Sequence, residues 1–166
     1  MTNLFDGIVA PPDKKVRKKR PKQVTEGYFR EGLTKLDNIL HHRIQNLGHV
    51  KTPGDFYVWG PERCFLIECK QVTDKDVFYF SRLTQLNFLL NFDSIHAKNR
   101  SYVLLCFWYG SKKKSHTFMV DISAINNLIL SGSKGITVEE LERTFKAYRV
   151  YVSDKGNWWD LAGYFW

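Results

Sequence analysis

The chain has few cysteines and no long apolar run. Three of its 166 residues are cysteine (Cys64, Cys69 and Cys106), and none forms a Cys-x-x-Cys pair or has metal-ligand spacing with a histidine. This pattern excludes a disulfide scaffold and predicts buried, reduced thiols in a cytoplasmic protein. No apolar segment approaches the roughly 20 residues of a membrane-spanning helix, and the N-terminus lacks the apolar core of a signal peptide. We therefore expect no membrane partner.

Acidic residues are outnumbered by basic ones. The chain has 25 Lys and Arg against 17 Asp and Glu, a formal net charge of +8. Seven of the nine residues from 14 to 22 are Lys or Arg. This balance favours a polyanionic partner, because each neutralised phosphate releases counterions. The clustering weighs against a generally basic surface, but charge alone does not separate DNA from RNA or anionic lipid.

Length and composition indicate one folded domain with an arm. The hydrophobic fraction of 43% is enough for a core, and 166 residues leave little room for two domains. We expect residues 1–23 to form a flexible basic arm and residues 24–166 to form a single domain. The candidate phosphate-contacting residues are Lys14, Lys15, Arg17, Lys18, Lys19 and Arg20 in the arm and Lys112, Lys113 and Lys114 in a turn.

Hydrophobic periodicity predicts a mixed α/β (α+β) fold, with a small mixed sheet flanked by helices. The aromatic C-terminus, residues 158–166, is expected in the core or at a subunit interface, and an apolar chain end favours a dimer. The predicted elements are a helix capped by Thr25 and ending before Gly48, strands 55–59 and 64–70, a helix 78–92, strands 101–109 and 117–121, helices 122–130 and 138–145, and a strand 147–152.

Two carboxylates and a lysine form the pattern that carries chemistry. Asp55 opens the first strand of a predicted hairpin, and Glu68 follows it by 13 positions in the second strand. Glu68 and Lys70 are two residues apart, so they share one face of that strand. Two carboxylates with a backbone carbonyl suit Mg²⁺ or Mn²⁺, and the lysine can position water or stabilise phosphate charge. An ordinary exposed Glu-x-Lys pair is the alternative. The surrounding apolar run weighs against it, because unpaired buried charge is expensive.

Short motifs in this order resemble the PD-(D/E)xK nuclease superfamily, and within it the RecU-type and archaeal Holliday junction resolvases. The resemblance covers roughly residues 25–130. Its motifs are Gly27 to Leu33 for the first helix, Thr52-Pro53-Gly54-Asp55-Phe56, Glu68-Cys69-Lys70, Phe80 to Leu89 with Gln85, and Tyr102 to Phe107 followed by Phe118 to Ile122.

The resemblance implies a restriction-endonuclease-like core and a Mg²⁺-dependent endonuclease that cuts branched DNA as a homodimer. It assigns metal binding to Asp55 and Glu68, a catalytic role to Lys70 and a supporting role to a carboxylate of the first helix. Glu31 fits the family motif best, and Glu26 is the alternative. Gln85 is a possible site-lining residue. The predicted helix ends too close to Asp55 for the stalk of RecU-type enzymes, so a restriction-like or nicking nuclease and a degenerate nucleic-acid-binding module remain alternatives.

Overall fold

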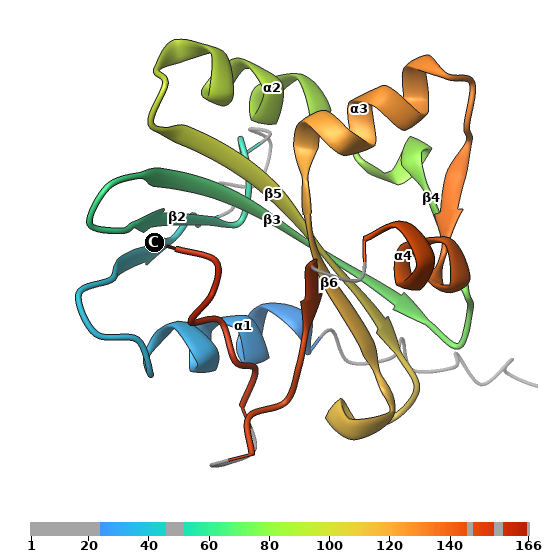
Figure 1. Ribbon diagram of the computed structural model, residues 1–166, viewed down its shortest axis with the longest axis horizontal. Helices are drawn as coiled ribbons and strands as arrows, with labels where there is room; N and C mark the ends of the chain where they lie inside the picture. Colours follow the sequence, from blue (N-terminus) through green and yellow to red (C-terminus); the bar gives the residue numbers. More distant parts are fainter. Residues whose placement is uncertain (1–23, 46–51, 146–147, 155–157, 166) are drawn as a thin grey trace, which may run out of the picture.

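The described part of the chain forms a six-stranded sheet with helices on both faces (Figure 1). The computed structural model describes residues 24–45, 52–145, 148–154 and 158–165. The elements are α1 (Thr25–Leu33), β1 (Leu40–Arg43), β2 (Phe56–Trp59), β3 (Cys64–Thr73), β4 (Val77–Tyr79), the 3-10 helix η1 (Phe80–Arg82), α2 (Leu86–Ile95), β5 (Asn99–Trp108), the 3-10 helix η2 (Lys112–Lys114), β6 (His116–Asp121), α3 (Ile122–Leu130), β7 (Gly135–Thr137), α4 (Val138–Thr144) and β8 (Arg149–Val150).

The sheet is mixed, with two long central strands. Its order is β1-β2-β3-β5-β6-β8, and β4 and β7 form a separate two-stranded sheet. Strands β3 and β5 pair in parallel over ten residues, whereas their other neighbours are antiparallel. Both strands are nearly continuous apolar runs, as expected for strands covered on both faces. The predicted α/β fold, a mixed sheet flanked by helices, is confirmed.

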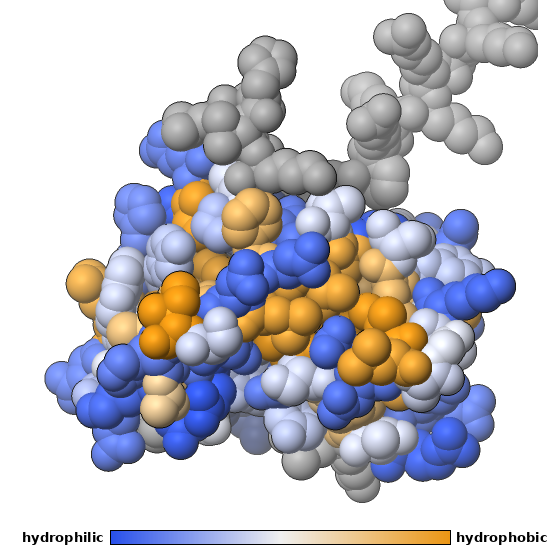
Figure 2. Space-filling view, turned by 90° about the horizontal axis from the view of Figure 1, so that it is seen from above, coloured by the Kyte–Doolittle hydropathy of each residue, from blue (hydrophilic) through white to orange (hydrophobic). Residues whose placement is uncertain are grey.

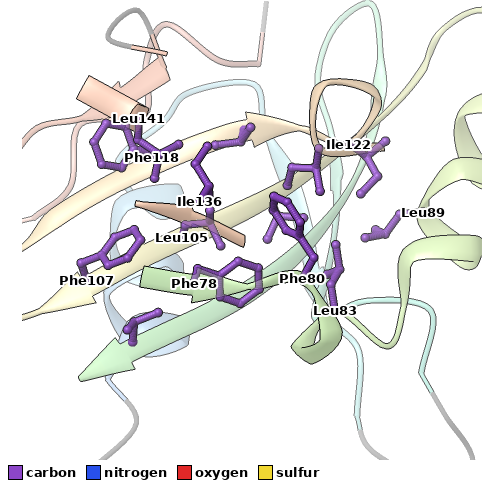
Figure 3. Close-up of a cluster of buried hydrophobic side chains, with 14 of the residues drawn as sticks. Phe78, Phe80, Leu83, Leu89, Leu105, Phe107, Phe118, Ile122, Ile136 and Leu141 are labelled. Carbon is purple, nitrogen blue, oxygen red and sulfur yellow. The ribbon is translucent and has the colours of Figure 1, made fainter. Parts of the chain in front are cut away.

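One face of the sheet packs against α2, α3, α4 and the small sheet. Its core contains Leu105 and Phe118 from the large sheet, Leu89 from α2 and Ile122 from α3, all buried (Figure 3). Figure 2 looks onto the helices of this face and shows apolar surface between hydrophilic side chains.

The other face packs against α1 and the C-terminal segment. Phe29 of α1 lies beside Phe165, and Trp159 and Leu161 are buried in the same cluster. A Cβ at Gly32 would lie 2.7 Å from the carbonyl oxygen of Trp159, so this position of the helix needs a residue without a side chain. These C-terminal side chains belong to the core of the chain itself. Their burial removes the argument for a dimer that rested on an exposed aromatic end.

The first predicted helix is wrong in length. It was expected to run to Leu47, but α1 ends at Leu33 and Leu40–Arg43 forms the edge strand β1. Asn38 between them has a φ of 60°, a left-handed conformation that asparagine tolerates better than most residues and that turns the chain. Leu40 continues the helical spacing of apolar residues, yet it lies exposed on the edge strand. Apolar spacing across a turn therefore imitated one long helix.

The second predicted helix is wrong at its start. It was expected from Phe78, but residues 77–79 form β4, and α2 begins at Leu86. Phe78 is buried and Tyr79 is exposed, which is the two-residue alternation of a strand. The partner of this strand is Gly135–Thr137, far along the sequence. Pairing with a distant segment therefore overrides the local helical pattern.

Local signals fix most of the remaining elements. The β2–β3 hairpin, β5, β6, α3 and α4 are confirmed, and the last predicted strand is shorter, at Arg149–Val150. The Asp121 side chain accepts a hydrogen bond from the Ser123 amide and caps α3, and Thr137 with Glu140 forms a capping box on α4. None of the helices in the described part of the chain is long and apolar enough to cross a membrane.

Candidate active site

The hairpin brings Asp55 and Glu68 to adjacent positions. Asp55 directly precedes β2, and the register that pairs Phe56 with Ile67 sets it beside the middle of β3. Its backbone N–H donates to the Ile67 carbonyl at 2.8 Å, and its Oδ2 accepts from the Cys69 amide at 2.7 Å. These two bonds fix the main chain and the carboxylate of Asp55 against β3. The two carboxylates are therefore neighbours in the fold, as the sequence predicts.

Glu68 is a buried carboxylate with one unpaired oxygen. Only 2% of its surface is exposed. Its Oε1 accepts from Lys70 Nζ, and its Oε2 is buried with no hydrogen-bond partner. Burial, followed by the charge of Asp55, raises the pKa of Glu68 to about 7, although Lys70 opposes the shift. Burial also raises the pKa of Asp55, against the opposing hydrogen bond from Cys69.

The donor set fits a hard divalent cation. Two neighbouring carboxylates with raised pKa values and an unpaired buried oxygen form a site where a cation would relieve both desolvation and repulsion. Mg²⁺ is commonly held by one or two carboxylates while it keeps several waters. Among the described residues, no group of three or more His, Cys, Asp or Glu side chains is arranged to hold a metal. At this site, Asp55 and Glu68 are the two carboxylates that could hold such a cation.

Lys70 lies beside this pair on the same face of β3. Its ammonium pairs with Glu68 and lies 3.4 Å from Oε1 of Gln85. Gln85 immediately precedes α2, and its Oε1 also accepts from the Thr84 hydroxyl at 2.9 Å. The structure thus brings Gln85, a possible site-lining residue from sequence, into contact with Lys70. Glu68 and Gln85 together hold the ammonium at the edge of the carboxylate pair.

The helix carboxylate at this site is Glu26. Its charge contributes to the raised pKa values of Asp55 and Glu68, and it pairs with Arg43 of β1. Glu31, favoured by the family motif, instead pairs with Lys112 at 2.9 Å. Five residues of α-helix turn by about 140°, so the two glutamates point to different sides of α1. Of the two glutamates, Glu26 therefore lies on the side of α1 that is nearer to Asp55 and Glu68, and Glu31 lies beside Lys112.

Gln71, which the sequence reading missed, anchors the start of α1. Its Oε1 accepts from the backbone N–H of Val24 at 2.8 Å and from both the N–H and the hydroxyl of Thr25. Thr25 was expected to cap the helix, but it is the first helical residue and no side chain caps α1 from position 24. Gln71 lies next to Lys70 on the opposite face of β3. A polar residue ending a buried run was the available signal.

A pocket with two arginines adjoins the carboxylates and was also missed. It has a volume of about 300 Å³ and is lined by Glu26, Gly27, Arg30 and Arg43. Burial and the charge of Arg30 lower the pKa of His41, which places this imidazole near the same arginine. Arg30 is one helical turn after Glu26, and Arg43 is two residues after His41 on β1. The signal in the sequence was the spacing of these residues, four apart on the helix and two apart on the strand.

The predicted basic residues differ in what they contact. Lys112 is buried against Glu31, whereas Lys113 and Lys114 are exposed in η2 at the turn between β5 and β6. The arm residues Lys14, Lys15, Arg17, Lys18, Lys19 and Arg20 lie outside the residues that the structure describes. The lysine turn is on the α1 side of the sheet, away from Glu68 and Lys70. It is therefore a surface distinct from the carboxylate pair.

The likeness to known proteins is one of fold, and it is weak. No protein-family model matches the chain, and no curated protein matches it significantly. Among solved structures, Hjc of Archaeoglobus fulgidus, a Holliday junction resolvase from an archaeal hyperthermophile, is similar with a TM-score of 0.40 and 17% sequence identity. The likeness covers 69% of this chain and 97% of that chain. A likeness at this level carries no argument about activity, which must come from the residues of the site.

Proposed function

We propose that the protein is a metal-dependent endonuclease and that Asp55, Glu68 and Lys70 form the site that cleaves DNA. The observation that carries the proposal is the buried, unpartnered Oε2 of Glu68 beside a second carboxylate and a fixed ammonium. A protein keeps such a group when something outside the chain pairs with it. A divalent cation and a phosphodiester meet that need together, because Mg²⁺ sites commonly combine carboxylates with substrate phosphate.

The roles of the residues follow from their positions. Asp55 and Glu68 would hold Mg²⁺ or Mn²⁺, which supplies Lewis acidity for activating water and stabilising charge on the phosphate. Lys70 provides a positive charge at the edge of the pair, where it stabilises the developing negative charge or orients the attacking water. Gln85 limits the movement of the Lys70 ammonium. The chain thus supplies positioning and electrostatics, the main requirements of phosphoryl chemistry.

The pocket between α1 and β1 is the proposed phosphate contact of this site. Arg30 and Arg43 supply guanidinium groups, which match phosphate oxygens in pairs. Glu26 balances Arg43 in the free protein. A phosphate entering the pocket would compete with Glu26 for Arg43, and the released carboxylate would remain beside the metal ligands. Glu26 rather than Glu31 is therefore the proposed supporting carboxylate.

The proposed substrate is branched DNA, with the Holliday junction as its leading form and a homodimer as the acting species. These finer points rest on the resemblance of the motifs around Asp55 and Glu68 to junction resolvases. Coordinated cutting of two opposed strands requires two sites, which a symmetric dimer provides. Exposed apolar residues of α2 and α3, namely Phe88, Ile95 and Leu130, are the proposed contact surface for a second copy.

A cleavage assay tests the activity and the substrate separately. The wild-type protein is incubated with a synthetic four-way junction or a linear duplex of the same arm sequence, with Mg²⁺ or with EDTA. We expect Mg²⁺-dependent cutting of the junction, and loss of at least a hundredfold in rate for Asp55→Asn. Glu31→Gln is the matched control on the opposite side of α1 and should cut normally. Equal cutting of both substrates removes the junction claim and leaves a restriction-like or nicking nuclease. Unchanged cutting by Asp55→Asn removes the proposed metal site.

A further inference from the structure

A basic and aromatic groove crosses the turn between β5 and β6, outside the carboxylate site. Two pockets share Lys112 and Lys113 as lining residues. The first has a volume of about 310 Å³ and is also lined by Tyr28, Trp108, Gly110 and Ser111. The second has a volume of about 180 Å³ and is also lined by Ser115, Arg149, Val150, Tyr151, Val152 and Trp159. Together these pockets form what we call the turn groove.

Aromatic rings stand at both ends of the turn groove. Trp108 lies 5.6 Å from Tyr28, measured between ring centroids, with the rings tilted by 36°. Tyr151 is 52% exposed at the other end, and the Arg149 guanidinium lies 5.2 Å from its ring centroid. A half-exposed tyrosine and a partly exposed tryptophan leave ring surface available to a flat partner.

The lysines in and beside the groove fall into two kinds: Lys112 and Lys113 line it, whereas Lys114 follows them in η2 and lines neither pocket. Lys112 is held within the protein, because it pairs with Glu31 and its ammonium lies 4.0 Å from the Tyr28 ring centroid. Lys113 and Lys114 are exposed, and no ion pair of either lysine occurs among the described residues. The buried lysine therefore shapes the groove, and the two exposed lysines are available to an anionic partner.

We propose that the turn groove binds an unpaired nucleic-acid strand. Alternating aromatic faces and cations suit a chain of alternating bases and phosphates, in which bases stack and phosphates pair with lysine. In a duplex the base faces are already stacked on one another, so Trp108 and Tyr151 could not use them. The turn groove thus selects for single-stranded segments through its rings and for polyanions through Lys113 and Lys114.

Strand binding by the groove does not depend on the proposed nuclease function. Only the role of this binding during cleavage rests on that function. Tyr28 follows Glu26 by two residues, which is about 200° around α1, so the first turn of that helix separates the groove from the carboxylates. A branched substrate with an unpaired arm could place its duplex at the carboxylates and its free strand in the groove. Among branched DNA, the groove would add affinity for forms with a single-stranded segment, such as a fork or flap, beside the fully paired junction of the proposed function.

Binding in EDTA tests the groove without cleavage. Fluorescence anisotropy is measured with labelled oligothymidylate and with a blunt duplex for the wild type and for Tyr151→Ala/Lys113→Ser. We expect about tenfold weaker single-strand binding from the lost stacking and phosphate contacts, and less than a twofold change for the duplex. The slope of log affinity against log salt should fall by about 0.7 for the single strand. The double variant should also bind oligouridylate about tenfold more weakly than the wild type does, since base faces and phosphates are common to DNA and RNA.

Tyr79→Ala/Lys98→Ser is the matched control, because Tyr79 is also 52% exposed and Lys98 is an exposed lysine distant in sequence from the turn. It should bind both probes as the wild type does. The proposal is overturned if both double variants behave alike, if single strand and duplex weaken equally, or if only one of the two polymers is affected. Asp55→Asn should bind oligothymidylate normally, so failure of the cleavage proposal leaves this result unchanged.

Discussion

At the residue scale, we expect Glu68 to lower the stability of the protein when no cation is bound. A buried carboxylate oxygen without a hydrogen bond lowers stability by roughly 1–3 kcal/mol. Replacing Glu68 with Gln removes the charge while keeping an oxygen for Lys70, so the metal-free variant should unfold at a higher temperature than the wild type. Mg²⁺ or Mn²⁺ should raise the unfolding temperature of the wild type only, because ligands stabilise the state that binds them.

Differential scanning calorimetry with and without the ion measures both effects of Glu68→Gln. Glu142→Gln is a suitable control, because Glu142 pairs with Arg149 and His116 far from the carboxylate site in sequence. Its metal response should equal that of the wild type. A wild type that shows no metal-dependent shift, or a Glu68→Gln variant that shows a full one, would contradict the assignment of Glu68 as a ligand.

Asp93 makes stability depend on pH. Its Oδ1 is buried without a partner, and burial raises the pKa of Asp93 to about 6. Between pH 4 and pH 6 the folded chain keeps this proton while the unfolded chain has released it, so the free energy of unfolding falls as pH rises. Asp93→Asn should reduce that fall, measured by urea unfolding from pH 4 to pH 7. Asp37→Asn, an exposed control, should keep the wild-type slope, and an unchanged slope in Asp93→Asn would refute the prediction.

At the scale of elements, the start of α1 depends on a single side chain. Gln71→Leu removes the acceptor for the amides of Val24 and Thr25, at a stability cost of about 1–2 kcal/mol. The start of the helix should shift and move Glu26, so cleavage should slow while the protein remains folded. Gln71→Glu keeps the acceptor oxygens and should restore the rate. A leucine variant with normal kcat and KM would show that Gln71 supports the fold without positioning the site.

Two glycines of α1 give opposite predictions. A Cβ at Gly32 would meet the Trp159 carbonyl at 2.7 Å and the Leu161 side chain at 2.9 Å, so Gly32→Ala should destabilise the protein by about 1–3 kcal/mol. A Cβ at Gly27 meets no atom within 4 Å, and alanine should stabilise the helix there by about 0.5–1 kcal/mol. Urea unfolding of the pair separates a packing effect from helix propensity. Equal effects of the two substitutions would contradict the close contact with the C-terminal segment.

Elements with local signals could be read from the sequence, and those made by distant pairing could not. The apolar spacing after Asp121 predicted α3 with its observed bounds. The turn after Trp59 gave the hairpin, and with it the pairing of Asp55 and Glu68. In contrast, β4 exists because Gly135–Thr137 lies beside it, and no feature near Phe78 reports that partner.

At the scale of the whole molecule, the same limit applies to the site. Strand period placed Glu68 and Lys70 on one face, because that relation is local. The choice between Glu26 and Glu31 required the direction in which α1 packs, which follows from the buried side of the helix and the position of the C-terminal segment. The arginine pocket depends on the contact of α1 with β1, and β1 was itself unforeseen. Tertiary packing therefore determines which glutamate and which arginines lie near Asp55, Glu68 and Lys70.

The net charge of the whole chain predicts strong salt dependence of DNA binding. Seven basic residues lie between positions 14 and 22 of a chain whose formal net charge is +8. Each lysine or arginine that contacts duplex phosphate contributes about 0.9 to the slope of log affinity against log salt. Replacing all seven by Gln in the 166-residue chain should lower this slope by several units for every DNA sequence. Metal-dependent unfolding shifts should stay unchanged, because Asp55 and Glu68 are untouched. An unchanged slope would show that the arm makes no phosphate contacts, and a lost metal response would show that the arm and the carboxylate site are not independent.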